Sequence, residues 1–387
     1  MAFNQVFAPF AFWLLSLLTN TQLDYPLVKQ MKRKLIFKKL TPQTQHAYLD
    51  LTNATSQLTL DTLPAELMQT VLSLISHKDS TSLCRSSKKL KNLVAPLLYR
   101  VVEFDTPQDQ HIFGDFTRRI YTTPLFHTKS LTFRNHWFDE FKVGYKELVP
   151  ADVGCLPIWN RGHEASGDNR LSDIIYAYNK LVRAALKAIP KQQLNTFRSY
   201  SLFPVNGKII EILLSQQNES LQQLRLFRLS DAPNTSDCLP SMNLQAIECR
   251  SLEPDSWPVH ENEELDGVIA FITNLIKTNS STLRCLTIGH EAQIVRRNYS
   301  RRSPGFEDEG AVLQALVSME MLLSLSSLTL VGLNVDPTRW DLFSRSVELS
   351  CLRKLTLEWC AGSAELVQQL AAAVTTNDQA ERIQLSI

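Results

Sequence analysis

The sequence lacks the residue patterns on which catalysis and cofactor binding most often depend. It contains no GxGxxG or GxxxxGKS/T segment to bind phosphate groups, and no GxSxG turn to present a nucleophilic serine. The segment RGHEASGD holds His163 and Glu164 but no second histidine four residues after the first, which a zinc-protease helix requires. We therefore predict no catalytic residue, no cofactor and no metal site, and a protein that is not itself an enzyme.

An excess of charge of one sign is also missing. Lys and Arg number 40 and Asp and Glu number 39, so the net charge is +1 and gives no basis for bulk nucleic-acid binding. The seven cysteines form no CxxC pair and no Cys/His metal spacing, and their odd number fits a reduced interior better than a disulfide framework. We expect a cytoplasmic or nuclear protein that does not bind nucleic acid.

No hydrophobic run is long enough to cross a membrane. The strongest, VFAPFAFWLLSLL at residues 6–18, is too short for a hydrocarbon core of about 30 Å, and it lacks the basic start and the cleavage site of a signal peptide. We expect residues 1–58 to be a partly disordered leader, apolar and then basic, without membrane attachment. A secreted or membrane-tethered repeat receptor is the alternative, which glycans at Asn218 or Asn279 would support.

Residues 59–104 predict a small helical unit. Leu63-Pro64 suits a helix entry, because a proline in the first turn sacrifices no helical hydrogen bond. Apolar residues then recur at helical spacing, and the segment SHKDSTS breaks the helix and offers Asp79 as the N-cap of a second one. The segment KKLKNLVAPLLYR predicts a third. Three short helices bury little surface alone, so the unit must pack on the following domain or dock on a partner.

Beyond residue 190 a repeated pattern predicts a different architecture. The template LxxLxL, with Ile or Cys replacing Leu at some positions, matches five segments, at residues 221–226, 244–249, 283–288, 325–330 and 352–357. Amphipathic helical stretches lie between several of them, and weaker strand patterns occur at 130–133, 194–202 and the final RIQLSI. We predict an α/β fold in which residues 105–387 form an irregular leucine-rich-repeat-like solenoid of short parallel strands alternating with helices. Long insertions are expected near 134–172 and 290–310.

Residues between the repeated leucines should point away from the core, because side chains alternate along a strand. In the clearest strands they are Arg225, Phe227, Glu248, Arg250, Thr287, Thr329, Thr356 and Glu358. We expect these side chains to bind a protein substrate, with Phe227 beside arginines as an anchor, since aromatic and Arg side chains dominate interface energies. Their mixed signs allow no prediction of the partner's charge.

The helical segment also resembles a known family. LPAELMQTVLSLISHKDSTSLCRSSKKLKNLVAPLLYRVVEF resembles the F-box, especially the form found in fungal F-box proteins with degenerate leucine-rich repeats. The resemblance implies a three-helix F-box and the substrate-recognition subunit of an SCF ubiquitin ligase. In that family the F-box binds a Skp-type adaptor, which links it to cullin and RING subunits. The adaptor contacts implied are Leu63, Pro64, Glu66, Leu67, Val71, Leu74, Leu83, Lys88 and Leu90.

The second helix departs from the family pattern. It carries Ser80, Arg85 and Ser86 where the F-box usually has apolar residues, which thins the contacts of that helix. The alternative is a leucine-rich-repeat scaffold without a ubiquitin role, whose helical unit only caps the array. Leu67→Asp separates the two, because it should abolish adaptor binding in the first case alone.

Overall fold

The computed structural model of the 387-residue chain contains two compact units, Met1–Leu98 and Tyr99–Ile387. It describes residues 72, 76–86, 88–106, 113–134, 168–201, 203–233, 239–240, 242–251, 262–289, 323–333, 335, 341, 345–348, 350–358, 360–374 and 384–386. The expected leader, almost all of the expected first helix and most of the two expected insertions lie outside these residues.

The described part of the first unit consists of two helices, α5 (His77–Ser86) and α6 (Lys88–Leu98). The N-cap of α5 is Ser76, whose hydroxyl accepts a hydrogen bond from the backbone N–H of Asp79 at 3.2 Å and donates one to the Asp79 carboxylate at 2.5 Å. The expectation that Asp79 is the cap is therefore wrong: it lies in the first turn, where a carboxylate favours the helix dipole. Helix α6 buries one face, formed by Leu90, Val94, Ala95 and Leu98.

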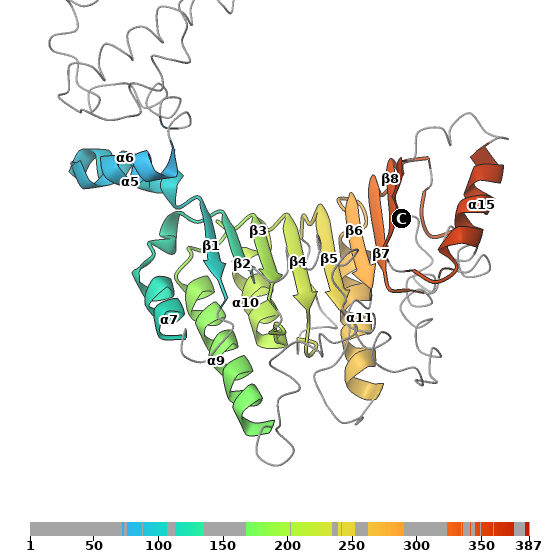
Figure 1. Ribbon diagram of the computed structural model, residues 1–387, viewed down its shortest axis with the longest axis horizontal. Coiled ribbons are helices and arrows are strands. Elements are labelled where there is room, and N and C mark those ends of the chain that lie inside the picture. The colour runs from blue at the N-terminus through green and yellow to red at the C-terminus, as the bar shows by residue number, and fades with distance from the viewer. Residues whose placement is uncertain are drawn as a thin grey trace, which may run out of the picture. The chain divides into compact units, whose positions relative to one another are not determined.

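The second unit is an α/β fold built on a parallel sheet of nine strands in sequential order, β1 to β9 (Figure 1). The strands are β1 (Val101–Asp105), β2 (Ser130–Arg134), β3 (Thr196–Tyr200), β4 (Gln223–Arg228), β5 (Ala246–Ser251), β6 (Cys285–Gly289), β7 (Ser327–Val331), β8 (Lys354–Glu358) and β9 (Gln384–Ser386). The helices are α7 (Phe113–Thr122), η4 (Leu125–His127), α9 (Asp168–Lys187), α10 (Gly207–Gln217), α11 (Asn262–Thr278) and α15 (Ser363–Val374). Parallel neighbours joined through helices give a solenoid-like arrangement.

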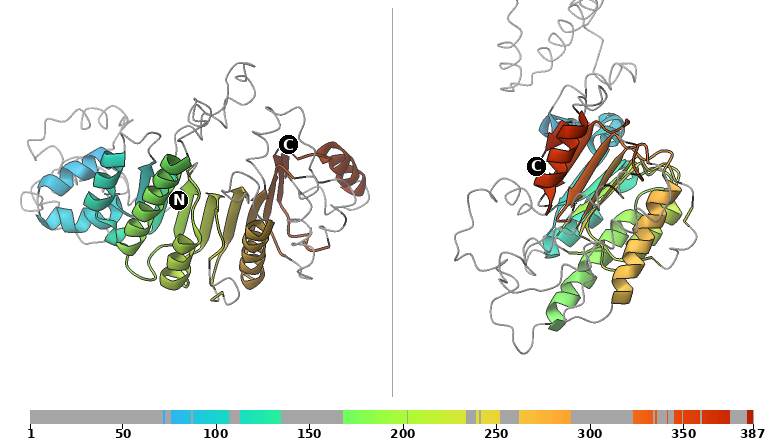
Figure 2. Two further views of the ribbon diagram at one scale, coloured as in Figure 1. Left: turned by 90° about the horizontal axis from the view of Figure 1, so that it is seen from below. Right: turned by 90° about the vertical axis from the view of Figure 1, so that its right-hand side faces the viewer.

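One face of the sheet forms the core through ladders of paired apolar side chains. A continuous ladder runs from β2 to β8 through Leu131, Phe197, Leu224, Ile247, Leu286, Leu328 and Leu355. Each of these residues is at most 2% exposed. Helices α9, α10 and α11 stand side by side along the sheet and bury residues such as Leu186, Leu213 and Phe271 in the same core (Figure 2). The leucines of the repeated pattern therefore lie in register on neighbouring strands and pack against one another in the core.

Two buried amide side chains, each at the C-terminal end of a helix, make equivalent hydrogen bonds to the backbone of a loop. Gln217, the last residue of α10, accepts hydrogen bonds from the backbone N–H groups of Gln193 and Leu194, both at 2.9 Å. Asn279, directly after α11, accepts one from the backbone N–H of Leu244 at 3.1 Å. In both cases the helix end is tied to the loop that leads into the strand before that helix. Each amide thereby satisfies backbone groups that would otherwise be buried without partners.

The sheet begins earlier than the sequence pattern predicts. Strand β1 lies within the segment assigned to the helical unit, and it pairs with β2 through Val102–Leu131 and Phe104–Phe133. The boundary expected at residue 104 is therefore corrected to one after Leu98, because VVEFD alternates buried and exposed residues as a strand does. Helix α7 was not predicted, and α9 begins inside the insertion expected near 134–172. The weak patterns at 130–133, 194–202 and the C-terminus contribute β2, β3 and β9.

Candidate protein-binding face of the sheet

The second face of the sheet carries the polar residues that lie between the buried ones. Strand pairing places Arg225, Glu248, Thr287, Thr329 and Thr356 in one row across β4 to β8. This row is five of the eight residues predicted from strand alternation. The structure therefore brings together, on one face, side chains that are up to 131 positions apart in the sequence, from Arg225 to Thr356.

The remaining three predicted residues lie two positions further along their strands, on the same face. Phe227 and Arg250 occupy corresponding positions of β4 and β5, between the pairs Leu226–Cys249 and Arg228–Ser251. Glu358 ends β8 and pairs with Val331 of β7. The second row is thus more mixed in size and polarity than the first.

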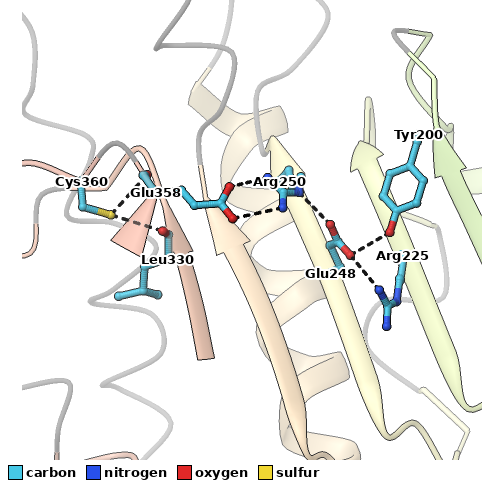
Figure 3. A network of polar contacts seen from close by, with 7 residues as sticks. All are labelled: Tyr200, Arg225, Glu248, Arg250, Leu330, Glu358 and Cys360. Carbon is cyan, nitrogen blue, oxygen red and sulfur yellow. Dashed lines mark hydrogen bonds and ion pairs between the residues drawn. The ribbon is translucent and has the colours of Figure 1, made fainter. Parts of the chain in front are cut away.

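A network of polar contacts connects the two rows (Figure 3). Arg250 donates from Nε to Glu248 Oε1 at 2.7 Å and from Nη1 to Glu358 Oε2 at 2.8 Å. The other oxygen of Glu248 accepts the hydroxyl of Tyr200 at 3.0 Å and lies 3.7 Å from Nη1 of Arg225. One arginine therefore joins two carboxylates, and one carboxylate joins three side chains from β3, β4 and β5.

Burial divides this network into a structural centre and an accessible margin. The side chains of Arg250 and Glu248 are only 7% and 10% exposed, whereas those of Arg225 and Glu358 are 33% and 32% exposed. Buried charges are tolerated only when they are paired and hydrogen-bonded, as both are here. Arg250 and Glu248 accordingly hold the surface in place, and Arg225 and Glu358 are the charged groups that a partner can reach.

Tyr200 was not predicted as a site residue, although its hydroxyl is part of the network. Burial raises the pKa of Tyr200, and the adjacent negative charge of Glu248 raises it further. The tyrosine therefore stays protonated and donates its hydrogen to Glu248. Its strand has the sequence TFRSY, which lacks the repeated leucine template, so alternation alone could have identified it but the template could not.

Gly289 lies in the row of the sheet that contains Arg250 and Glu358. It lies in β6, paired with Val331 of β7, between the strands that carry Arg250 and Glu358. A Cβ atom at Gly289 would lie 2.1 Å from the backbone oxygen of Val331, so no other residue fits without moving the backbone. The Arg250–Glu358 pair thus extends past two intervening strands, one of which presents no side chain at that position.

The predicted adaptor contacts lie mostly outside the described residues. This applies to Leu63, Pro64, Glu66, Leu67, Val71 and Leu74. Lys88 is exposed and Leu83 is half-buried, whereas Leu90 is 8% exposed and belongs to the buried face of α6. Arg85 and Ser86 are exposed, so their polarity costs no packing in the helical unit, but Ser80 is buried.

The described residues hold no group of three or more His, Cys, Asp or Glu side chains placed to bind a metal ion. Within the same part of the chain, no helix is both long and apolar enough to cross a membrane. A shallow groove between α7 and α9 is lined by Gly114, Thr117, Tyr121, Asp173, Ile174, Ala177, Lys180 and Leu181. It contains one acid and one base but no hydrogen-bonded pair of the kind that nucleophilic catalysis needs.

Comparison with known proteins adds no assignment. No model of a known protein family matches the sequence, and no curated protein matches it.

Proposed function

We propose that this protein is the substrate-recognition subunit of an SCF-type ubiquitin ligase. The observation that carries the proposal is the order of parts in one chain: a segment resembling the F-box is followed directly by strand–helix repeats with a polar sheet face. Either part alone is common among proteins, but the combination matches the architecture that the resemblance implies. The chain would have no catalytic role of its own.

The finer structural assignment is part of this proposal. Helices α5 and α6 fall on the second and third helices of the F-box-like segment, which favours a three-helix unit completed by residues before 76. The repeated leucines in β4 to β8 favour a degenerate leucine-rich-repeat solenoid over an unrelated parallel sheet. Both features are expected of the fungal type of F-box protein.

The mechanism follows from placement. The F-box-like unit would bind the Skp-type adaptor and, through it, the cullin and RING subunits, while the polar face of the sheet binds a protein substrate. Holding both in one assembly raises the effective concentration of substrate lysines near the ubiquitin-loaded enzyme. We expect this assembly in the cytoplasm or nucleus.

Co-expression with a Skp-type adaptor, followed by affinity capture, tests the proposal. The native chain and a shortened chain starting near residue 58 should both retain the adaptor, and Leu67→Asp should lose it by at least about tenfold, because a charge cannot enter an apolar interface. Tyr121→Asp is the matched control: it places the same charge on a 66% exposed side chain of α7 and should leave capture unchanged. Absence of capture by both well-folded native forms would contradict the proposal and favour a repeat scaffold.

The secreted alternative meets a structural obstacle at Asn279, one of the two asparagines named for it. Asn279 is 0% exposed. Its side-chain nitrogen donates to the carbonyl of Leu275 at 2.8 Å, and its side-chain oxygen accepts a hydrogen bond from the backbone N–H of Leu244. A glycan on this nitrogen is incompatible with the described fold. Asn218 is half-buried, so mass spectrometry at that residue still tests the alternative.

A further inference from the structure

Two arginines lie directly opposite each other on the polar face. Arg198 of β3 pairs in register with Arg225 of β4, and neighbouring strands are about 4.8 Å apart. Like charges directly opposite one another in a sheet are destabilising. The fold thus maintains an unfavourable pair at the point where its row of polar residues changes from arginine to glutamate.

The described carboxylates of this face do not relieve the repulsion. Glu248 and Glu358 both make their shortest contacts with Arg250, at 2.7 and 2.8 Å. Glu103 of β1 pairs with Arg134 of β2 at 3.1 Å. Only Glu248 approaches the arginine pair, at 3.7 Å from Arg225, and within the described residues no carboxylate lies within 4 Å of Arg198.

The hydrogen bonds of the two guanidinium groups are also incomplete. Arg198 donates from Nη2 to the side-chain oxygen of Gln223 at 3.2 Å, and the buried Nε atoms of Arg198 and Arg225 have no protein partner. A guanidinium offers five N–H donors, and a buried donor without an acceptor costs free energy. These Nε atoms are closed to another molecule, but a negative charge brought to the partly exposed Arg225 side chain would offset the repulsion between the two guanidinium groups.

We infer that Arg198 and Arg225 bind a carboxylate in an acidic segment of the protein partner. Arg198, Arg225 and Arg250 carry three positive charges and Glu248 and Glu358 carry two negative ones, so one positive charge is left in excess, which one carboxylate neutralises. A dianionic phosphate would leave a negative excess next to Glu248, so the geometry favours Asp or Glu side chains over a phosphorylated residue. Tyr200 and Phe227 lie two residues after Arg198 and Arg225, on the same face of β3 and β4. They supply aromatic surface beside the charge, as in many interface centres.

This inference rests on the proposed function only in assuming that the polar face binds a protein. It can be tested without the adaptor, so a failure of adaptor capture and a failure of acidic recognition would be seen separately. The probe is a fluorescein-labelled peptide of alternating Glu and Gly, with a Gln version and a phosphoserine version for comparison. Binding to the full chain is measured by fluorescence anisotropy at low ionic strength, where charge contacts are least screened.

The native chain should bind the Glu peptide at least about tenfold more tightly than the Gln peptide. The double variant Arg198→Gln/Arg225→Gln should lose this preference, and Arg225→Gln alone, which alters a one-third exposed side chain, should weaken it. Arg118→Gln is the matched control, because it removes the same charge from a 74% exposed position on α7 and should leave binding unchanged.

Three results would overturn the inference. The first is equal binding of the Glu and Gln peptides to the native chain. The second is an equal loss in Arg118→Gln and in the two polar-face variants, which would mean that net charge alone is sensed. The third is binding of the phosphoserine peptide only, which would replace the carboxylate by a phosphate. If the double variant unfolds, Arg225→Gln decides between these outcomes.

Discussion

The two faces of the sheet follow one hydrogen-bonding register but opposite rules of composition. On the core face, each step of the ladder from β2 to β8 is Leu, Ile or Phe. On the polar face, the neighbouring row changes from Thr132 to Arg198 and Arg225, then to Glu248 and three threonines. The core face stabilises the stack, whereas the polar row keeps partly exposed side chains for recognition, namely Arg198, Arg225, Thr287 and Thr329.

The largest expected effect is the difference in stability loss between substitutions at two adjacent residues of β7, one on each face of the sheet. Leu328 is 0% exposed, and Leu328→Ala should lower the free energy of unfolding by about 4 kcal/mol through lost burial and the cavity it leaves. Thr329→Val, one residue further on the polar face, should change it by less than about 0.5 kcal/mol. Urea denaturation followed by circular dichroism measures both. Equal losses would mean that the polar face is as constrained as the core.

The polar face contains one exception to this tolerance. Arg250→Gln should cost about 3 kcal/mol at neutral pH, because it leaves Glu248 and Glu358 without their shared cation. The control is Arg345→Gln, whose partner Asp341 lies at 3.0 Å with both side chains about 70% exposed, and its cost should be below about 0.5 kcal/mol. A loss of less than about 1 kcal/mol in Arg250→Gln would show that the network is dispensable.

The smallest effect concerns Tyr178 of α9, which is 0% exposed and packs with its ring centroid 6.4 Å from that of Phe116 and 6.0 Å from that of Phe133. Burial raises the pKa of Tyr178 to about 12, outweighing the hydrogen bond between its hydroxyl and Ser199. Between pH 10 and 12 the unfolded chain releases this proton while the folded chain keeps it, so stability falls as pH rises, by at most about 1.4 kcal/mol per pH unit. Tyr178→Phe should make the fall shallower, with Tyr200 still contributing in the same direction. An unchanged slope would place Tyr178 in contact with water.

Much of the sheet could be predicted from short-range pattern. The leucine template identified β4 to β8, and strand alternation identified which of their residues share the polar face. Strand β1 was missed because its two valines follow a helix without a turn signal, and α7 and α9 were missed because they lie between strands that lack the template. Ser76 and Asp79 are both residue types that cap helices, and only the hydrogen bond from the Asp79 N–H to the Ser76 hydroxyl shows which of them is the cap of α5.

The contacts of the site could not be predicted in the same way. Arg250 and Glu358 are 108 residues apart, and nothing in their spacing indicates that β5 and β8 lie within reach of one side chain. Glu248 and Glu358 pair with Arg250, whereas Arg198 and Arg225 keep an excess of positive charge. Which charges pair depends on the strand register and on the side-chain rotamers. Sequence alternation therefore located the surface, whereas its electrostatic character became visible only from the distances.

The ion pair between Arg250 and Glu358 has a consequence for how the array can grow or shrink. The Arg250–Glu358 pair closes at 2.8 Å with two strands, β6 and β7, between its members. Adding a repeat there would separate the pair by a further strand spacing of about 4.8 Å, and deleting one would crowd it. The ion pair can therefore form only when two strands lie between β5 and β8. It fixes the number of repeats in this part of the array, which the backbone of a solenoid alone does not fix.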